Sequence, residues 1–247
     1  MKRIDLLCST RRPEVTQGTI NWWQSKGWEV KTWYNDGYPC GTGRNKMLEE
    51  FYASDRDWMV MADDDITLYT HRYNTQWFLD KPELWQTQTD VDYFSLNSNN
   101  ETHRQMMKSW WDTDEFNQQL IFKRDITPTK IHIFRKPKTE LWFEEWYGYE
   151  DYDFALQFIN EEMTVARLLN VFLREQGFSK SSLFEGQEHR KECYAQARIE
   201  LEKKWGNVLL QVLKNKWVPR GLWHNHPRYD WICCESNQDK MFAQLFV

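Results

Sequence analysis

The stretch Trp58-Met-Val-Met-Ala-Asp-Asp-Asp-Ile66 is the most informative part of this sequence. Its apolar part has the length of a buried strand, and Val60 and Ile66 favour an extended backbone. The strand ends in the three adjacent carboxylates of residues 63–65, which repel one another and are costly to bring together without a cation. Mg²⁺ and Mn²⁺ prefer such oxygen ligands and can in turn hold a diphosphate. The simpler alternative is a solvated acidic turn after a strand.

The segments around this stretch alternate between predicted strands and helices. Strands are predicted over Ile4–Cys8, Glu29–Tyr34, Asp57–Ala62 and Tyr93–Leu96, and helices over Val15–Lys26 and from Gly41 to Phe51 or Ala53. Alternation of this kind predicts an α/β fold with a parallel sheet and crossover helices. At 247 residues the chain can form one such domain around a single core.

Charged side chains follow the predicted strand ends. They are Arg11, Arg12, Asp36, Arg44 and the acidic residues 63–65. In parallel sheets ligands bind beyond the carboxyl ends of the strands. One crevice would thus gather arginines, carboxylates and a metal, which suits a nucleoside diphosphate. The glycines of Gly41-Thr-Gly-Arg-Asn45 would allow close backbone approach, and a flexible loop with a capping Asn is the alternative.

A second acidic group lies in Trp146-Tyr-Gly-Tyr-Glu-Asp-Tyr-Asp-Phe154, before a helix predicted over Ala155–Glu162. Acids in the first turn of a helix are favoured by its dipole, so a structural explanation exists. Five aromatic residues around three acids exceed what a helix start needs. An apolar wall raises the pKa of a carboxylate and makes it a better base. One of these acids could therefore take a proton from an acceptor hydroxyl.

Composition indicates a folded globular protein with 40% hydrophobic and 28% charged residues. The net charge of −5 argues against a chain-wide nucleic-acid-binding surface, though not against a local basic one. Five cysteines without paired zinc spacing are expected to be reduced thiols of a cytoplasmic protein. The start Met1-Lys-Arg-Ile-Asp does not resemble a signal peptide, and no apolar run approaches about 18 residues. We therefore expect no membrane association.

A basic stretch spans Lys123–Lys138, and Lys130-Ile-His-Ile-Phe134 within it alternates like a half-buried strand. Such a strand could meet an anionic acceptor, or it could be a solvated charged face. The chain also has 15 Trp, whose rings are good platforms for sugars or bases, although packing in the core accounts for most of them.

These motifs resemble those of the GT-A glycosyltransferases. Met61-Ala-Asp-Asp-Asp-Ile66 is similar to their Asp-x-Asp motif, and Gly148-Tyr-Glu-Asp-Tyr-Asp153 to their later Glu-Asp motif. Gly43-Arg-Asn45 resembles a Gly/Ala-Arg-Asn loop of family-2-like members, and Glu202-Lys-Lys-Trp-Gly206 the Lys-Trp-Gly that often ends their catalytic domains. The four matches occur in the family's order. The resemblance implies a GT-A (Rossmann-like) domain over residues 1–206, with a mixed, mostly parallel sheet flanked by helices. It says little about residues 207–247, which we expect to form an extension packed on the same domain.

The resemblance also implies roles for individual residues. Asp151 matches the catalytic base and Glu150 an acid that contacts the acceptor, for which Trp146, Tyr149 and Asp153 are further candidates. Donor nucleotide binding falls to Ser9, Arg11, Asp36, Arg44 and Asp63. Asp65, with Asp63, would hold Mn²⁺ (or Mg²⁺), and the donor would be a UDP-sugar transferred with inversion.

The sequence departs from the family at the third metal ligand. Many members have a His soon after the strand that follows the Glu-Asp helix, whereas Asn170-Val-Phe-Leu-Arg-Glu175 contains none. His189, His224 and, less favourably, His226 are the remaining candidates, since a lone His is more often structural than a ligand.

The acceptor is open. Phages carry small enzymes that glycosylate hydroxymethylated pyrimidines in their DNA, and this chain is similar in size and composition; the enzyme would then act in the host cytoplasm. A saccharide, lipid or protein acceptor is the alternative, and a non-catalytic nucleotide-sugar-binding protein is a second one. The sugar and the oligomeric state leave no signal in the sequence.

Overall fold

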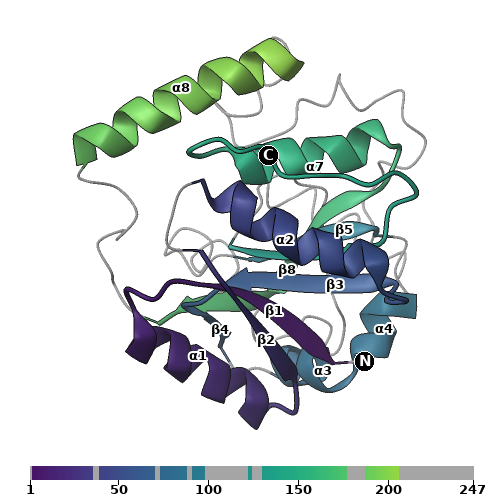
Figure 1. The fold of residues 1–247 in the computed structure, drawn as a ribbon. Coiled ribbons are helices and arrows are strands. Elements are labelled where there is room, and N and C mark those ends of the chain that lie inside the picture. The colour runs from purple at the N-terminus through teal and green to yellow at the C-terminus, as the bar shows by residue number, and fades with distance from the viewer. Residues whose placement is uncertain are drawn as a thin grey trace, which may run out of the picture.

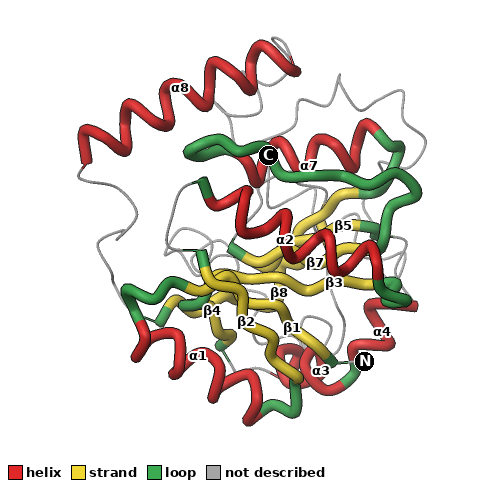
Figure 2. The backbone as a smooth tube through the Cα atoms, viewed as in Figure 1, coloured by secondary structure: helices red, strands yellow, loops and turns green. Residues whose placement is uncertain are grey.

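The computed structural model of this chain describes residues 2–35, 39–69, 73–87, 91–97, 122–123, 130–176 and 187–205. These residues form one mixed sheet with helices on both faces (Figures 1 and 2). This is the α/β architecture that alternating strands and helices predict. Among the described helices, none combines the length and apolar character needed to span a bilayer. The predicted extension over residues 207–247 lies outside the described part of the chain.

The predicted strands and helices are present with small shifts at their ends. In chain order the structure has β1 (Arg3–Cys8), α1 (Pro13–Ser25), β2 (Glu29–Tyr34), α2 (Cys40–Ala53), β3 (Trp58–Asp63), β4 (Ile66–Leu68), α3 (Tyr73–Asp80), α4 (Pro82–Thr87), β5 (Tyr93–Asn97), β6 (Phe122–Lys123), β7 (Ile131–Arg135), α7 (Glu150–Asn160), β8 (Val165–Glu175) and α8 (Gln187–Trp205).

The strands of the sheet run in both directions. Their order is β2-β1-β3-β7-β5-β8-β4, and β6 also pairs with β8. β1 is parallel to β2 and β3, and β5 is parallel to β8. β7, β4 and β6 run antiparallel to their neighbours. Five of the eight described strands therefore point one way, which confirms the mixed, mostly parallel sheet.

Two apolar layers hold the helices on the sheet. α1, α3 and α4 cover one face through the buried side chains of Trp23, Phe78 and Trp85. α2 and α7 cover the other face through a cluster that includes Phe51 and Phe154, and α8 lies on the far side of α7 (Figure 1). Burying apolar area on both faces is the main stabilising contribution to such a fold.

β7 differs from its predicted half-buried pattern. Ile131, His132, Ile133 and Phe134 are all buried, because β7 lies inside the sheet between β3 and β5 and has helices on both sides. The antiparallel direction of β7 also brings its first residues, rather than its last, to the edge where β1, β2 and β3 end.

α7 begins at Glu150, five residues before its predicted start. Gly148 and Tyr149 both have positive φ, 127° and 60°, and this reversal starts the helix directly at the acidic residues. Glu150, Asp151 and Asp153 thereby lie in the first turn, where the dipole favours acids.

The segment of residues 141–143 connects α2 to α7 without being a strand. Asn45 of α2 both donates to and accepts from the backbone of Phe143, each at 2.9 Å. Tyr52 makes the same pair of bonds with Leu141, and Gln157 of α7 makes it with Trp142. Three side chains thus do for this segment what a neighbouring strand would do.

Candidate active site

Asp64 fixes the loop after β1. Its Oδ2 accepts hydrogen bonds from the Ser9 N–H (3.0 Å) and the Thr16 hydroxyl (2.6 Å), and its Oδ1 pairs with Arg12, the N-cap residue of α1. Asp64 and Asp65 are buried, so the alternative of a solvated acidic turn is wrong. The middle carboxylate of the triplet therefore ties the end of β3 to the start of α1.

Asp65 is bonded through only one of its oxygens. Oδ2 accepts from Arg12 Nη1 at 3.1 Å, whereas Oδ1 is buried and has no hydrogen-bond partner in the described structure. Burial, together with the nearby charge of Asp63, raises the pKa of Asp65 to about 6. The ionised form of Asp65 is therefore destabilised in the folded protein, and a cation bound at Oδ1 would stabilise it.

The glycines of α2 allow Arg44 to reach the edge of the sheet. A Cβ at Gly41 would lie 2.3 Å from the carbonyl oxygen of Glu144, and one at Gly43 would lie 2.6 Å from Leu7 Cδ1. The close approach that these glycines predict is thus made to the protein's own chain. The motif forms the first turns of α2 rather than a flexible loop.

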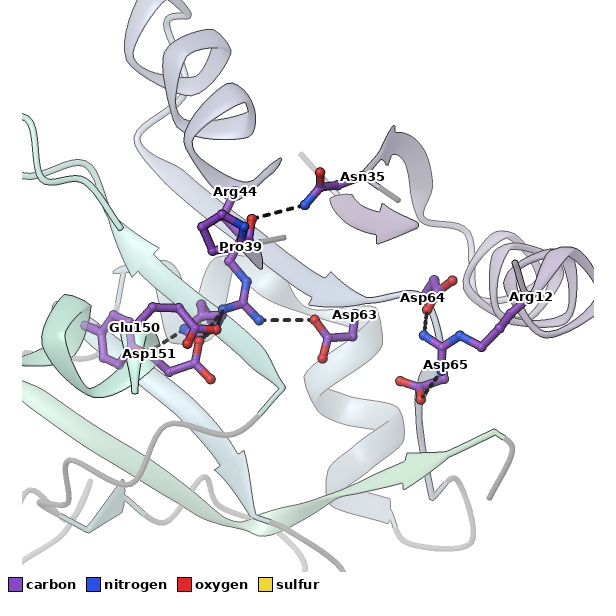
Figure 3. A network of polar contacts seen from close by, with 11 residues as sticks. Arg12, Asn35, Pro39, Arg44, Asp63, Asp64, Asp65, Glu150 and Asp151 are labelled. Atoms are coloured by element: carbon purple, nitrogen blue, oxygen red, sulfur yellow. Dashed lines mark hydrogen bonds and ion pairs between the residues drawn. The ribbon is translucent and has the colours of Figure 1, made fainter. Parts of the chain in front are cut away.

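Arg44 joins the two acidic motifs (Figure 3). Its Nη2 donates to Asp63 Oδ1 at 3.2 Å, and its Nη1 donates to Glu150 Oε1 at 2.9 Å and pairs with Asp151 Oδ1. The Arg44 side chain is only 5% exposed, so its charge is shared among three carboxylates away from water. The two motifs, which are 87 residues apart in sequence (150 − 63), therefore meet at one guanidinium.

The Glu150–Asp151 pair divides its charge unequally. Burial raises the pKa of Glu150, and the adjacent Asp151 raises it further. Burial also acts to raise the pKa of Asp151, but Arg44 and His132 outweigh it and lower that pKa. When two close carboxylates interact this strongly, the negative charge settles on one of them, here Asp151.

His132 is a site residue that the sequence analysis did not identify. Its Nε2 lies 3.3 Å from Asp151 Oδ1, and its Nδ1 lies 2.7 Å from the Tyr93 hydroxyl. The signal available in the sequence was one ionisable residue inside the apolar run Ile131–Phe134. Arg12 was noted as one of two arginines in its loop, but not as the one that contacts Asp65.

Asp153 was predicted to contact the acceptor, and this is wrong. Its side chain is fully buried and accepts hydrogen bonds from Trp205 Nε1 (2.7 Å), Lys204 Nζ (3.1 Å) and Gln157 Nε2 (2.6 Å). Lys204 and Trp205 belong to the motif that resembled the Lys-Trp-Gly domain end. Asp153 therefore attaches the end of α8 to α7 and has no free oxygen for a substrate.

The other predicted acceptor residues lie around the start of α7. Trp146 and Tyr149 are partly buried, and Tyr149 has Tyr152 and Tyr194 as ring neighbours at 5.7 and 5.3 Å. Tyr147 between them is 40% exposed. Their contact with an acceptor stays a prediction.

Several predicted residues remain untested by these contacts. Ser9 is buried and accepts the Arg11 N–H through its hydroxyl, while the Arg11 side chain is exposed. His189 lies on α8. Asp36, His224 and His226 lie outside the described residues. Cys8, Cys40 and Cys193 form no disulfide within the described chain.

Three cations of the basic stretch, Lys130, Arg135 and Lys136, contact other parts of the protein. Lys130 Nζ lies 3.0 Å from Glu175, and although burial lowers its pKa, Asp65 and Glu175 raise it to a net increase. Lys136 donates to the Ser54 carbonyl oxygen, and Arg135 lies over the Trp58 ring. The contacts of these three side chains are thus made within the protein.

The residues at the edge fit a divalent ion in part. Asp63 and Asp65 offer oxygen ligands, and the buried Asp65 Oδ1 lacks a partner, whereas no group of three His, Cys, Asp or Glu side chains suited to a metal occurs in the described structure. Mg²⁺ and Mn²⁺ are often held by one or two carboxylates, with water and substrate phosphate completing the shell. Five carboxylates (63, 64, 65, 150 and 151) lie at this edge, and three cations, Arg12, Arg44 and Lys130, offset part of their negative charge.

Comparisons with known proteins give only distant likenesses. No protein-family model matches the chain, and no curated protein matches it. Among solved structures, A197 from STIV has a TM-score of 0.41 and 10% identity over 76% of this chain and 100% of its own. HddC from Yersinia pseudotuberculosis, complexed with GMP-PN, has a TM-score of 0.39 and 8% identity over 80% and 100%. A glycosyltransferase involved in glycosylation of the major capsid of PBCV-1 has a TM-score of 0.28 and 12% identity over 54% and 60%.

Proposed function

We propose that this protein is a glycosyltransferase that moves a sugar from a UDP-sugar to an acceptor hydroxyl. The observation that carries the proposal is the bridge through Arg44, which places Asp63 of the first acidic motif beside Glu150 and Asp151 of the second. A cluster that resembles a donor site and a candidate base thus share one edge of the sheet, as this reaction requires.

In the proposed mechanism Asp151 is the base. Its side chain is 26% exposed, and its contacts within the described chain are all made by Oδ1, so Oδ2 is open. Oδ2 takes the proton of the acceptor hydroxyl, whose oxygen attacks the anomeric carbon as the bond to the diphosphate breaks. Attack opposite the leaving group inverts the anomeric centre. Glu150 is more buried and has the raised pKa, and geometry decides between the two because a base must reach its proton.

The donor diphosphate would lie near Asp63, Asp65 and Arg12. Asp65 Oδ1 and Asp63 would hold Mn²⁺ or Mg²⁺, which when bound supplies positive charge to the leaving diphosphate. Ser9 and Arg11 of the same loop are the proposed nucleotide contacts.

For the acceptor we propose hydroxymethylated pyrimidine in phage DNA, with a saccharide, lipid or protein as the alternative. The half-exposed Tyr147 and its neighbours Trp146 and Tyr149 support a stacked base or sugar beside Asp151. Lys130 and Lys136 of the basic stretch do not add support for DNA, because they bond to other parts of the protein.

One experiment tests the activity and the acceptor together. The protein is incubated with Mn²⁺, a panel of UDP-sugars, hydroxymethylpyrimidine duplex and a saccharide pool, and each acceptor is analysed by intact mass spectrometry. A hexose or pentose added to DNA supports the favoured acceptor, and one added only to saccharide eliminates it. UDP binding without transfer to any acceptor would support a non-catalytic binding protein.

The Asp151→Asn variant tests the base. It should retain UDP affinity and lose about 10²–10⁴-fold in turnover, the usual contribution of a general base. Asp80→Asn, at an exposed position on α3, is the matched control. Turnover equal to that of the control would remove Asp151 from the mechanism.

Asp65→Ala tests the metal site. The variant should lose the response to added Mn²⁺ and bind UDP more weakly, because one of only two described carboxylate ligands is gone. Isothermal titration with and without Mn²⁺ measures both effects. Normal UDP affinity in Mn²⁺ would contradict the metal role.

A further inference from the structure

Two buried polar side chains lie behind Asp151 and take no part in the mechanism above. Tyr93 of β5 is 1% exposed and His132 of β7 is fully buried. Aromatic rings surround both side chains. The ring centroids of Phe134 and Phe158 lie 6.2 and 5.1 Å from that of Tyr93, and the centroid of Phe143 lies 5.4 Å from that of His132. Polar groups in such a place cost free energy unless they are bonded, and an apolar pair would fill the space without that cost.

The groups on the two sides of His132 favour one imidazole nitrogen as the carrier of the proton. The Tyr93 hydroxyl lies 2.7 Å from His132 Nδ1. Burial raises the pKa of Tyr93 well above its usual value, so the hydroxyl keeps its proton and can donate a hydrogen bond to Nδ1. The Asp151 carboxylate beside Nε2 can only accept one. A neutral imidazole that accepts at Nδ1 carries its own proton on Nε2. The N–H of His132 is therefore on the side of Asp151.

His132 and Arg44 meet Asp151 at the same oxygen. His132 Nε2 lies 3.3 Å from Asp151 Oδ1, close enough for a charge contact, although Nε2 is buried and has no hydrogen-bond partner in the described structure; Arg44 Nη1 pairs with the same Oδ1. The carboxylate is held from β7 and from α2 at one oxygen, while Oδ2 remains available.

We propose that Tyr93 and His132 position Asp151 for proton transfer, with Tyr93 setting the tautomer of His132 and His132 holding Oδ1 so that Oδ2 faces the acceptor. The inference rests on the proposed role of Asp151 as base. During transfer the acceptor proton moves to Oδ2, the acceptor oxygen bonds to the anomeric carbon, and the diphosphate leaves with the electrons of the broken bond. His132 keeps its proton throughout and does not touch the substrate.

The test compares His132→Phe with His132→Gln. Phe fits the aromatic surroundings but cannot donate, whereas the Gln amide can place an N–H near Oδ1. His132→Phe should lower kcat about 10²-fold, the cost of a misplaced catalytic group, with the KM for the UDP-sugar unchanged. His132→Gln should recover part of that loss. Tyr93→Phe, which frees the tautomer but keeps the His132 donor, should have a smaller effect of about tenfold at most.

The pH profile separates positioning from packing. The groups that face Asp151 are Arg44 and Cys40 of α2, Glu150 of α7, His132 of β7 and Tyr93 of β5. His132 is one of the two groups that lower the pKa of Asp151, so its loss should move the acidic limb of kcat/KM to higher pH. A merely packing role would leave that limb in place. If His132→Phe does not fold, His132→Met, whose flexible side chain also cannot donate, takes its place in the comparison with His132→Gln.

The outcomes distinguish this inference from the proposed function. If the wild-type protein transfers sugar to no acceptor, the proposed function fails. If Asp151→Asn transfers sugar as well as wild type, the assignment of the base fails and the inference with it. If Asp151→Asn is impaired while His132→Phe keeps wild-type kcat and the wild-type acidic limb, the inference alone is overturned. In the double variant His132→Phe/Asp151→Asn, the loss should equal that of Asp151→Asn alone, because His132 acts only through Asp151. Additive losses would contradict positioning.

Discussion

Asp5, within β1, and Asp65, in the turn after β3, are both buried, but their bonds differ. Both oxygens of Asp5 accept hydrogen bonds, from Arg3 (2.7 Å), Trp33 (3.1 Å) and Arg56 (2.9 Å). Asp65 has Arg12 at one oxygen and no partner at the other in the described structure. A fully bonded carboxylate stabilises the fold, whereas one left half-bonded at the ligand edge retains capacity for a ligand.

The largest effect on stability should come from replacing Asp5, the fully bonded aspartate. Asp5→Ala leaves the charges of Arg3 and Arg56 poorly compensated and should lower the free energy of unfolding by about 3–5 kcal/mol. Urea denaturation measures the loss. Turnover per folded molecule should stay at the wild-type level, and a loss under about 1 kcal/mol would mean that the Asp5 bonds are not structural.

Asp65, which is bonded at one oxygen only, should make the stability of the protein depend on pH. In the folded protein the pKa of Asp65 is raised to about 6, from about 3.9 in an unfolded chain, so the folded state binds more protons between these values. Wild-type stability therefore falls as pH rises through this window, by about 2 kcal/mol, whereas Asp65→Asn lacks this loss. Urea unfolding of both proteins at pH 4.5 and 7.5, with a chelator present, should show the variant gaining relative to wild type at the higher pH. An equal difference at both pH values would contradict the raised pKa.

A third buried aspartate, Asp153, extends the comparison, and its replacement should have the smallest effect on stability of the three. Asp153, like Asp5, is bonded at both oxygens, so Asp153→Asn should cost about 1 kcal/mol, because Asn still accepts from Trp205 but loses the charge opposite Lys204. The KM for the acceptor should not change. An increased acceptor KM with unchanged stability would restore the predicted substrate contact.

The sequence predicted the elements whose pattern is local. The strands at Glu29–Tyr34 and Tyr93–Leu96, and the helix from Gly41, follow from periodicity and from turn residues that act within a few positions. The meeting of Arg44 with Asp63 was expected because parallel strands bring their ends to one edge, whereas Asp151 was expected there only from the resemblance to GT-A enzymes.

The parts that were missed depend on distant neighbours. His132 becomes a site residue only because β7 enters the sheet antiparallel between β3 and β5, and a single His in a strand carries no sign of that direction. Asp153 and Asp151 are two residues apart in one acidic motif, but the helix turns one toward α8 and the other toward Arg44. The charge on residues 63–65 was expected to need a metal, whereas Arg12 and Arg44 reach it from other segments.

The connection over residues 141–143 bears on how this sequence can diverge. Asn45, Tyr52 and Gln157 bind the backbone of this segment rather than its side chains. Their hydrogen bonds, which set the spacing between α2 and α7, therefore use peptide groups that every amino acid except proline supplies in full. The partly buried Trp142 can therefore change with little effect on the distance from Arg44 to Glu150, whereas Leu141 and Phe143 are also buried in the core between α2 and α7. In a diverged homologue, the amide at 45, the phenol at 52 and the amide at 157 should therefore persist longer than the indole at 142.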